Sequence, residues 1–168
     1  DIAIEGNGFL QVEIPNGNTA YTRAGALKLD GDGRMTNSDG YPLIPAITIP
    51  DGATQITIGE TGIVSALIGS ETEPTELGTI QLATFTNASG LLAIGQNLFE
   101  ESGSSGDAQT GNPGDDGYGT LLQTYLEGSN VNIVEELASM ITTQRAYEIN
   151  SKTIQTSDEM MQTTNQLV

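Results

Sequence analysis

The chain has 168 residues, carries 22 acidic side chains against 5 basic ones for a formal net charge of −17, and contains no His, Cys or Trp. These absences exclude Ser-His-Asp and Cys-His nucleophiles, thiolate zinc sites, iron–sulfur clusters and haem ligated by His or Cys. Five scattered bases form no patch for phosphate backbones, so nucleic acid is excluded as a partner. No apolar run approaches the roughly 20 residues of a membrane-spanning helix, so we expect no membrane insertion.

The distribution of glycine and proline divides the chain in two. All 21 Gly and all 6 Pro lie in residues 1–128, and residues 129–168 contain neither. We therefore expect a β-rich domain over 1–128 and a helical arm over 129–168. A start at Asp1, without Met or a signal-like apolar stretch, further predicts that the chain was cut from a longer protein.

The first region alternates short β-forming runs with turn residues, which predicts antiparallel strands joined by hairpins. Asn16-Gly17 and Asp39-Gly40 are examples of the turn residues that tolerate positive φ. The expected strands are residues 9–14, 26–29, 46–49, 55–58, 63–68 and 79–85, with a last strand at 120–126. Between them, residues 102–119 are so polar and Gly-rich that we expect a long flexible loop that buries nothing.

The second region predicts one long amphipathic helix from about Val131 to Gln166, on the order of 54 Å in length. Asn132 and Glu135 have the spacing of a capping box, and acids in the first turn suit the positive end of the helix dipole. The fold class is therefore mainly β, an antiparallel body with a long polar loop followed by one C-terminal helix.

A 4,3 spacing of apolar residues along this helix is typical of a coiled coil. We call the following positions the seam: Ile133, Leu137, Met140, Gln144, Tyr147, Ser151, Ile154, Asp158 and Met161. Six of the nine are apolar, and such a face must be buried against something. The candidates are a segment outside this chain, another copy, a different protein, or the chain's own β-domain.

We predict that the arm makes self-assembly contacts through the seam and its neighbours. Arg145 and Lys152 serve either solubility or charge pairing across the interface. The predicted contact residues are Ile133, Val134, Leu137, Met140, Ile141, Gln144, Arg145, Tyr147, Lys152 and Ile154.

Motifs for catalysis and metal binding are weak. Asp30-Gly31-Asp32-Gly33 starts like a calcium loop, but Arg34 breaks the ligand spacing and no Glu stands at the twelfth position, so a hairpin turn is expected. Adjacent acids such as Asp115-Asp116 are unremarkable in so acidic a chain. We expect no enzyme, no cofactor and no metal.

Longer motifs recur along the whole chain in a fixed order. The main one is a run of polar and apolar positions through Ser129, Asn132, Glu136, Met140, Gln144 and Lys152. Upstream are Glu5–Phe9, Tyr21–Gly25, Asp32-Gly33, Ile47–Pro50, Gly90-Leu91, Gly95, Asn97-Leu98, Ser104–Gly106, Pro113-Gly114 and Leu126-Glu127. This set resembles the bacterial flagellar rod and hook proteins, and within that family it favours the distal rod branch. Thr124 departs from the resemblance, which implies Gly there.

The resemblance implies a structural subunit that assembles helically into a hollow shaft and carries torque from the motor to the hook. It implies an N-terminal helical segment, absent from this chain, as the partner of the C-terminal helix in an inner tube, with the β-domain outside. The implied partners are copies of the same chain, other rod proteins, hook protein and the surrounding basal-body ring. The implied location is the basal body in the periplasmic space, reached through the flagellar type III export apparatus.

Three alternatives remain open at the level of sequence. In the first alternative, the chain belongs to a proximal rod or hook protein of the same family. Cross-linking to hook protein or to inner rod components distinguishes these from a distal rod protein. In the second, the chain is a carbohydrate-binding or adhesin module on a helical stalk, although its eight aromatic residues are spread along the chain. The third is a carboxylate-based wall hydrolase, which turnover of peptidoglycan tests.

Overall fold

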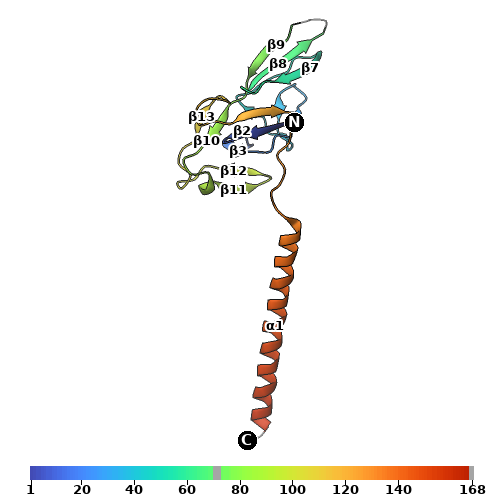
Figure 1. Ribbon diagram of the computed structural model, residues 1–168, viewed down its shortest axis with the longest axis vertical. Helices are drawn as coiled ribbons and strands as arrows, with labels where there is room; N and C mark the ends of the chain where they lie inside the picture. Colours follow the sequence, from blue (N-terminus) through green and yellow to red (C-terminus); the bar gives the residue numbers. More distant parts are fainter. Residues whose placement is uncertain (70–72, 167–168) are drawn as a thin grey trace. The chain divides into compact units, whose positions relative to one another are not determined.

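The computed structural model describes residues 1–69 and 73–166 (Figure 1). Its contacts divide the chain into two compact units, Asp1–Glu127 and a second unit from Gly128 onward. We call these the body and the arm. The body holds antiparallel strands and the arm holds one helix, which confirms the predicted fold class.

The largest sheet of the body has seven strands. Six follow the order β11-β12-β3-β2-β10-β13, and β6 also pairs with β2. Every pairing in this sheet is antiparallel. The strands are β2 (Phe9–Glu13), β3 (Thr19–Thr22), β6 (Leu43–Ile44), β10 (Leu82–Thr84), β11 (Leu92–Gly95), β12 (Leu98–Glu100) and β13 (Gln109–Gly111).

Three smaller sheets complete the body. The first joins β1 (Ile2–Glu5) to β14 (Thr120–Gln123), and the second is the hairpin of β4 (Lys28–Leu29) and β5 (Met35–Thr36). The third orders β7 (Ala53–Ile58), β8 (Ile63–Ile68) and β9 (Thr75–Thr79), and it lies at the opposite end of the body from β11 and β12 (Figure 1). A short 3-10 helix, Ala88–Gly90, precedes β11.

One apolar core joins these sheets. Side chains from β1, β2, β8, β10 and β14 meet in it, so strands from both ends of the body sequence share one interior. The buried members are Ile2, Ile4, Leu10, Val12, Ile14, Ala20, Met35, Leu43, Ile47, Ile49, Val64, Ile80, Leu82, Leu98 and Leu121. Gly25 lies so close to β1 that a Cβ at this position would collide with the carbonyl of Ile2. The backbone N–H of Ile2 donates to Gly25 O at 2.9 Å.

The turn between β4 and β5 is the predicted hairpin. One Asp30 carboxylate oxygen accepts the backbone N–H of Asp32 at 2.9 Å and of Arg34 at 2.8 Å, and the other oxygen accepts Arg34 Nε at 2.9 Å. Gly33 adopts φ 76°. The Asp30 carboxylate is therefore engaged in closing the turn.

The strand predictions are confirmed in part. Strands β2, β7 and β8 lie where the alternating runs predict them, and β14 covers only the first half of the predicted strand 120–126, since it ends at Gln123. The predicted strand 46–49 is wrong: it is reduced to an isolated bridge between Thr48 and Arg34, since Pro45 and Pro50 on either side lack the N–H that a ladder needs. The predicted strand 79–85 is two strands, because Ile80 turns to donate its N–H to Gly62 O at 2.8 Å.

The expectation that residues 102–119 bury nothing is wrong. Strand β13 lies within this segment and pairs with β10, and the Ser105 side chain is fully buried. The Ser105 hydroxyl accepts the Ser102 N–H at 2.9 Å and has the Ser102 and Gly106 carbonyls as acceptors at 2.9 and 3.0 Å. Local backbone bonds satisfy the hydroxyl, so a polar segment is buried without an unpaired group.

Candidate functional site

The arm begins with a capped helix, α1 (Ile133–Gln166). The Asn132 side-chain oxygen accepts the Val134 N–H at 3.1 Å, and the Asn132 carbonyl accepts the Glu136 N–H at 3.1 Å. Glu135 and Glu136 place negative charge in the first turn, where the helix dipole favours it. The predicted start at about Val131 is therefore two residues early, and the predicted capping residue is confirmed.

Several threonine side chains of α1 form hydrogen bonds with the helix backbone. Thr143, Thr153 and Thr156 each donate a hydroxyl to the carbonyl four residues earlier, at 2.9, 2.8 and 2.9 Å. These bonds satisfy the hydroxyls within the helix itself. The exposed apolar side chains are then what distinguishes one face of the helix from another.

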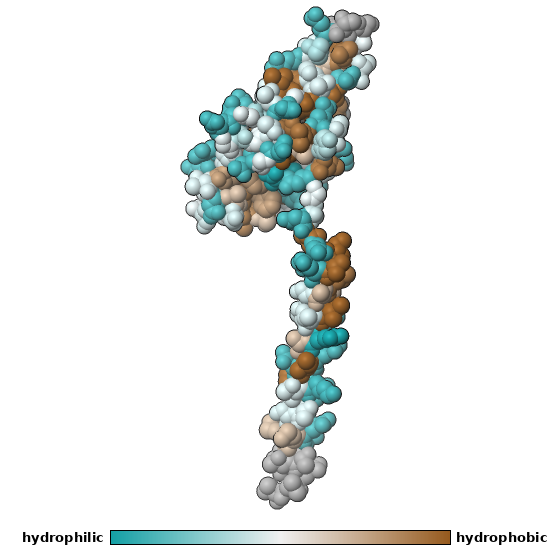
Figure 2. Space-filling view, in the orientation of Figure 1, coloured by the Kyte–Doolittle hydropathy of each residue, from teal (hydrophilic) through white to brown (hydrophobic). Residues whose placement is uncertain are grey.

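The predicted contact residues all lie on α1, and all are exposed. Figure 2 shows apolar side chains gathered along one side of the first half of the helix. The exposed fractions are 72% for Ile133, 73% for Val134, 50% for Leu137, 55% for Met140, 50% for Ile141, 77% for Tyr147 and 63% for Ile154. Gln144, Arg145 and Lys152 are exposed as well. So much contiguous apolar surface is typical of an interaction site.

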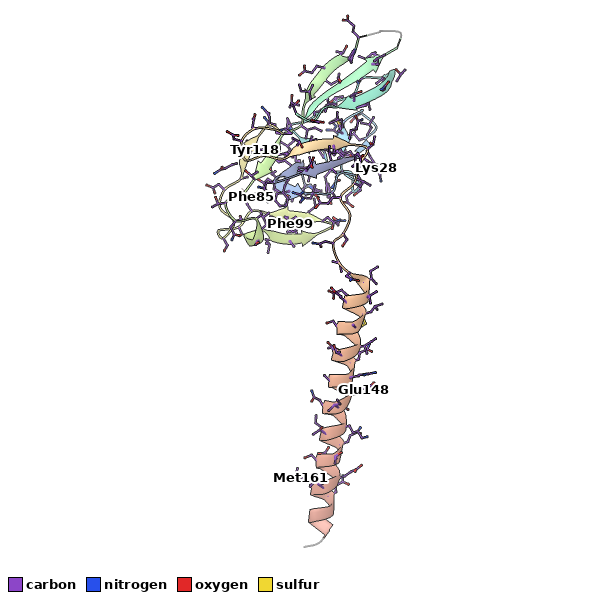
Figure 3. All side chains as sticks on the ribbon, in the orientation of Figure 1. Lys28, Phe85, Phe99, Tyr118, Glu148 and Met161 are labelled. Atoms are coloured by element: carbon purple, nitrogen blue, oxygen red, sulfur yellow. The ribbon has the colours of Figure 1, made fainter. Side chains whose placement is uncertain are left out.

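The sequence prediction missed a second line of apolar residues on α1. Ile149 and Met160 are 65% and 67% exposed and lie off the seam. With Ala138 they recur every 11 residues, close to three full turns, so all three lie along one face. That 11-residue spacing is the signal in the sequence. Figure 3 shows two labelled side chains, Glu148 and Met161, projecting from the helix.

In the body, a side-chain contact joins two residues for which the sequence analysis predicted no role. Arg23 Nε donates to a Glu127 carboxylate oxygen at 2.8 Å, across 104 positions of sequence. Both residues lie in motifs that carry the family resemblance. The sequence around each residue does not indicate that the two pair, because they are far apart in the chain. The same guanidinium also reaches carbonyls of Ile4, Gly6 and Gly8.

Half of the eight aromatic side chains, although spread along the chain, gather in one cluster in space. Phe9 contacts Phe85 and Phe99 edge-to-face with ring centroids 5.9 and 6.1 Å apart, and Tyr21 contacts Phe85 at 4.8 Å. Figure 3 labels Phe85 and Phe99, two members of this cluster. Burial raises the pKa of Tyr21, with a smaller contribution from the charge of Glu101.

The acid pairs do not form an enclosed site. Asp115, Asp116, Glu135 and Glu136 are exposed, whereas general acid–base chemistry requires carboxyls placed in an environment that tunes them. Within residues 1–69 and 73–166, no group of three or more Asp and Glu side chains is placed to hold a metal ion. In the same part of the chain, no helix combines the length and apolarity of a membrane span.

Two family models match the chain. Residues 3–66 match the flagellar hook protein FlgE/F/G D1 domain, which covers β1 to most of β8. Residues 122–167 match the flagellar basal body rod FlgEFG protein C-terminal model, which covers the end of β14 and the arm.

Curated relatives align along almost the whole chain. The flagellar basal-body rod protein FlgG of Buchnera aphidicola subsp. Acyrthosiphon pisum is 49% identical over 167 residues, which are 99% of this chain and 64% of the relative. The FlgG proteins of Borreliella burgdorferi and Bacillus subtilis are 50% and 42% identical, over 99% and 96% of this chain and 64% and 62% of their own lengths. The chain thus spans slightly less than two thirds of these relatives. With a matching β-body and a matching C-terminal helix, it belongs to the family of bacterial flagellar rod and hook proteins.

Proposed function

We propose that this chain is the larger part of a structural subunit of the flagellar basal-body rod, in its distal section. The subunit assembles helically with copies of itself into a hollow shaft that transmits torque from the motor to the hook. The observation that carries the proposal is the exposed seam on α1, with Leu137 and Met140 half-exposed and Tyr147 exposed by 77%. The names of the relatives, all called basal-body rod protein, support the same role.

A helix with an exposed apolar face is less stable than one whose apolar face is covered. Most helical stability in proteins comes from packing an apolar face, so α1 gains most when its seam is covered. The 4,3 spacing suits another helix as the cover. When one surface of a copy binds a different surface of the next copy, and the repeated rotation does not close into a ring, the copies form an open helix. A shaft has this helical symmetry.

The proposal extends to location and partners. The subunit acts in the basal body, in the periplasmic space, after export by the flagellar type III apparatus. Its neighbours are other rod proteins and hook protein, and the surrounding ring contacts the body. The role is structural, without catalysis, a cofactor, a metal or nucleic acid.

The decisive experiment places a charge on the seam of the full-length protein. We expect Leu137→Asp, on the seam, or Ile141→Asp, directly beside it, to leave the body folded and to abolish polymerisation and swimming, because each buries a carboxylate in an apolar interface. These two are the seam variants. Ser139→Asp, on the opposite side of α1, is the matched control and is expected to assemble. Normal rods and normal swimming from both seam variants would exclude the seam from assembly.

The adhesin alternative makes an opposite prediction about the body alone. If the aromatic cluster of Phe9, Phe85 and Phe99 binds sugars, glycan-array binding survives deletion of residues 131–168. We expect no such binding, because Phe9 already contacts Phe85 and Phe99 edge-to-face, and these contacts occupy part of each ring.

A further inference from the structure

The Arg23 side chain is held by four acceptors of the body. Its Nη1 donates to Gly8 O at 2.9 Å and to Gly6 O at 3.1 Å, its Nη2 donates to Ile4 O at 3.1 Å, and its Nε donates to Glu127 at 2.8 Å. The guanidinium carbon also lies 6.0 Å from the centre of the Phe9 ring. One side chain thereby connects the end of β3, the β1–β2 turn and the last residue of the body.

The three carbonyl contacts fix the guanidinium independently of Glu127. A guanidinium stays charged at all relevant pH values and presents its donors in a planar fork, so carbonyls on one side orient the donor on the other. Side-chain exposure is 30% for Arg23 and 44% for Glu127. The Glu127 carboxylate therefore meets a charged donor that is already in place.

The position of Glu127 in the chain gives this contact its meaning. Strand β14 ends at Gln123, and the last backbone bond to the start of the chain is Thr124 N–H to Asp1 O at 2.9 Å. Tyr125 and Leu126 are 63% and 54% exposed. Glu127 then returns to the body through its side chain, and the next residue, Gly128, opens the arm. Gly128 has the greatest backbone freedom of any residue type.

We propose that Arg23 is a positioning residue that acts through Glu127 to fix the point at which the arm leaves the body. The inference rests on the proposed function, in which an outer body and an assembling arm must be joined firmly enough to carry load. With the ion pair, free rotation begins at Gly128. Without the ion pair, residues 125–127 also rotate freely, so the flexible connection between body and arm, which we call the joint, is three residues longer.

The test measures backbone mobility of residues 125–127 in the full chain by amide ¹⁵N relaxation. In the wild-type chain we expect order parameters near about 0.85, the value for rigid backbone, and in Glu127→Gln a fall below about 0.6. The thermal midpoint of the body is expected to stay within the error of measurement, because ion pairs this exposed contribute little to stability. A purely structural role would move the midpoint and leave the mobility unchanged.

Asp32→Asn is the matched control. It also removes one carboxylate from an Arg ion pair of the body, the 3.5 Å contact with Arg34, but far along the chain from the joint. We expect it to leave the mobility of residues 125–127 unchanged. Equal mobility in wild type, in Glu127→Gln and in Glu127→Ala, which leaves the Arg23 Nε–H without this acceptor, would overturn the proposal. An equal rise in Asp32→Asn would also overturn it.

This measurement separates the joint from the assembly proposal. Relaxation reports on the unassembled chain, so it requires no polymer. If Glu127→Gln leaves the mobility of residues 125–127 unchanged while the seam variants fail to assemble, only the joint proposal is rejected. A rigid joint in a chain whose seam variants still assemble would reject only the seam.

Discussion

At the scale of single residues, the backbone of Thr124 is strained. Its φ is 71°, in the left-handed region, directly after β14 and where its N–H donates to Asp1 O. An L-residue there brings Cβ close to the following carbonyl, at a cost of roughly 1–2 kcal/mol. Thr124 is the position at which the family resemblance implies Gly, and the left-handed backbone conformation accounts for that implication.

We expect Thr124→Gly to stabilise the body by about 0.5–1 kcal/mol. Relief of the left-handed strain outweighs the larger conformational entropy that Gly gives the unfolded chain. Denaturant unfolding of the body measures the difference. Thr124→Ala retains Cβ and is expected to remain near wild type; a gain equal to that of Gly would assign the effect to the lost side chain instead.

A second residue-scale prediction concerns acid. The Arg34 backbone N–H, with the Asp32 N–H and the Arg34 guanidinium, holds the pKa of Asp30 below its ordinary value of 3.8, against a smaller opposing effect of burial. The folded state then binds the proton less readily than the unfolded state. The stabilisation is therefore complete above about pH 4 and is lost as pH falls through the lowered folded pKa.

We expect Asp30→Asn to flatten the loss of stability as the pH falls below about 4, since it removes a group that titrates differently in the two states. Unfolding midpoints measured across this range test it. Asp51→Asn removes an equal charge from another exposed position of the body and serves as the comparison. An unchanged slope in Asp30→Asn would remove this turn from the acid response.

At the scale of elements, α1 is a 34-residue helix whose start is stabilised locally and whose apolar face is exposed. It has no Gly or Pro to interrupt it, so it spans about 51 Å at 1.5 Å per residue. Its beginning depends on Asn132, because the first N–H groups of any helix lack partners inside the helix.

We expect Asn132→Ala to cost the first turn of α1 about 1 kcal/mol, because the Val134 N–H loses its side-chain acceptor. Carbon chemical shifts of residues 133–137 measure the resulting fraying. Asn132→Ser retains a capping oxygen and is expected to restore the helical shifts. Identical shifts in wild type and Asn132→Ala would show that another group caps the helix.

At the scale of the whole molecule, charge and contacts are distributed unequally between the two units. Residues 1–128 hold 17 of the 22 acids and 3 of the 5 bases, a net charge of −14, which leaves −3 on residues 129–168. Like charge on the bodies opposes their unspecific association, while the nearly balanced arm is free to pack on copies of itself. We further propose that the body is an independently folding domain.

We expect residues 1–127 alone to unfold cooperatively with a thermal midpoint within about 2 °C of that in the full chain, less than the several degrees that 1 kcal/mol produces in a domain of this size. The reason is that, among the residues whose burial the structure describes, the whole apolar core lies in this range. Calorimetry of both chains measures it. A midpoint lowered by more than about 10 °C would show that the arm stabilises the body.

Local features were predictable from the sequence because their causes are local. The helix follows from the 4,3 spacing and from Asn132 as its cap, and both act within a few residues. The β-body follows from alternating runs and turn residues such as Asn16-Gly17, where Gly17 indeed adopts φ 81°. The exclusion of His and Cys chemistry required only composition.

The long-range pairings were decided by the tertiary structure alone. Ile2 pairs with Gln123, Arg23 binds Glu127, and Ser105 is buried within a polar segment, because each depends on partners whose identity the local pattern does not encode. Closure of β1 on β14 unites the two ends of the body, and the Arg23 guanidinium binds Glu127 beside that closure. Sequence periodicity and the distribution of Gly and Pro thus determined that a long helix with an apolar face follows the body. Tertiary contacts decided which distant segments of the body meet, because such partners leave no local pattern.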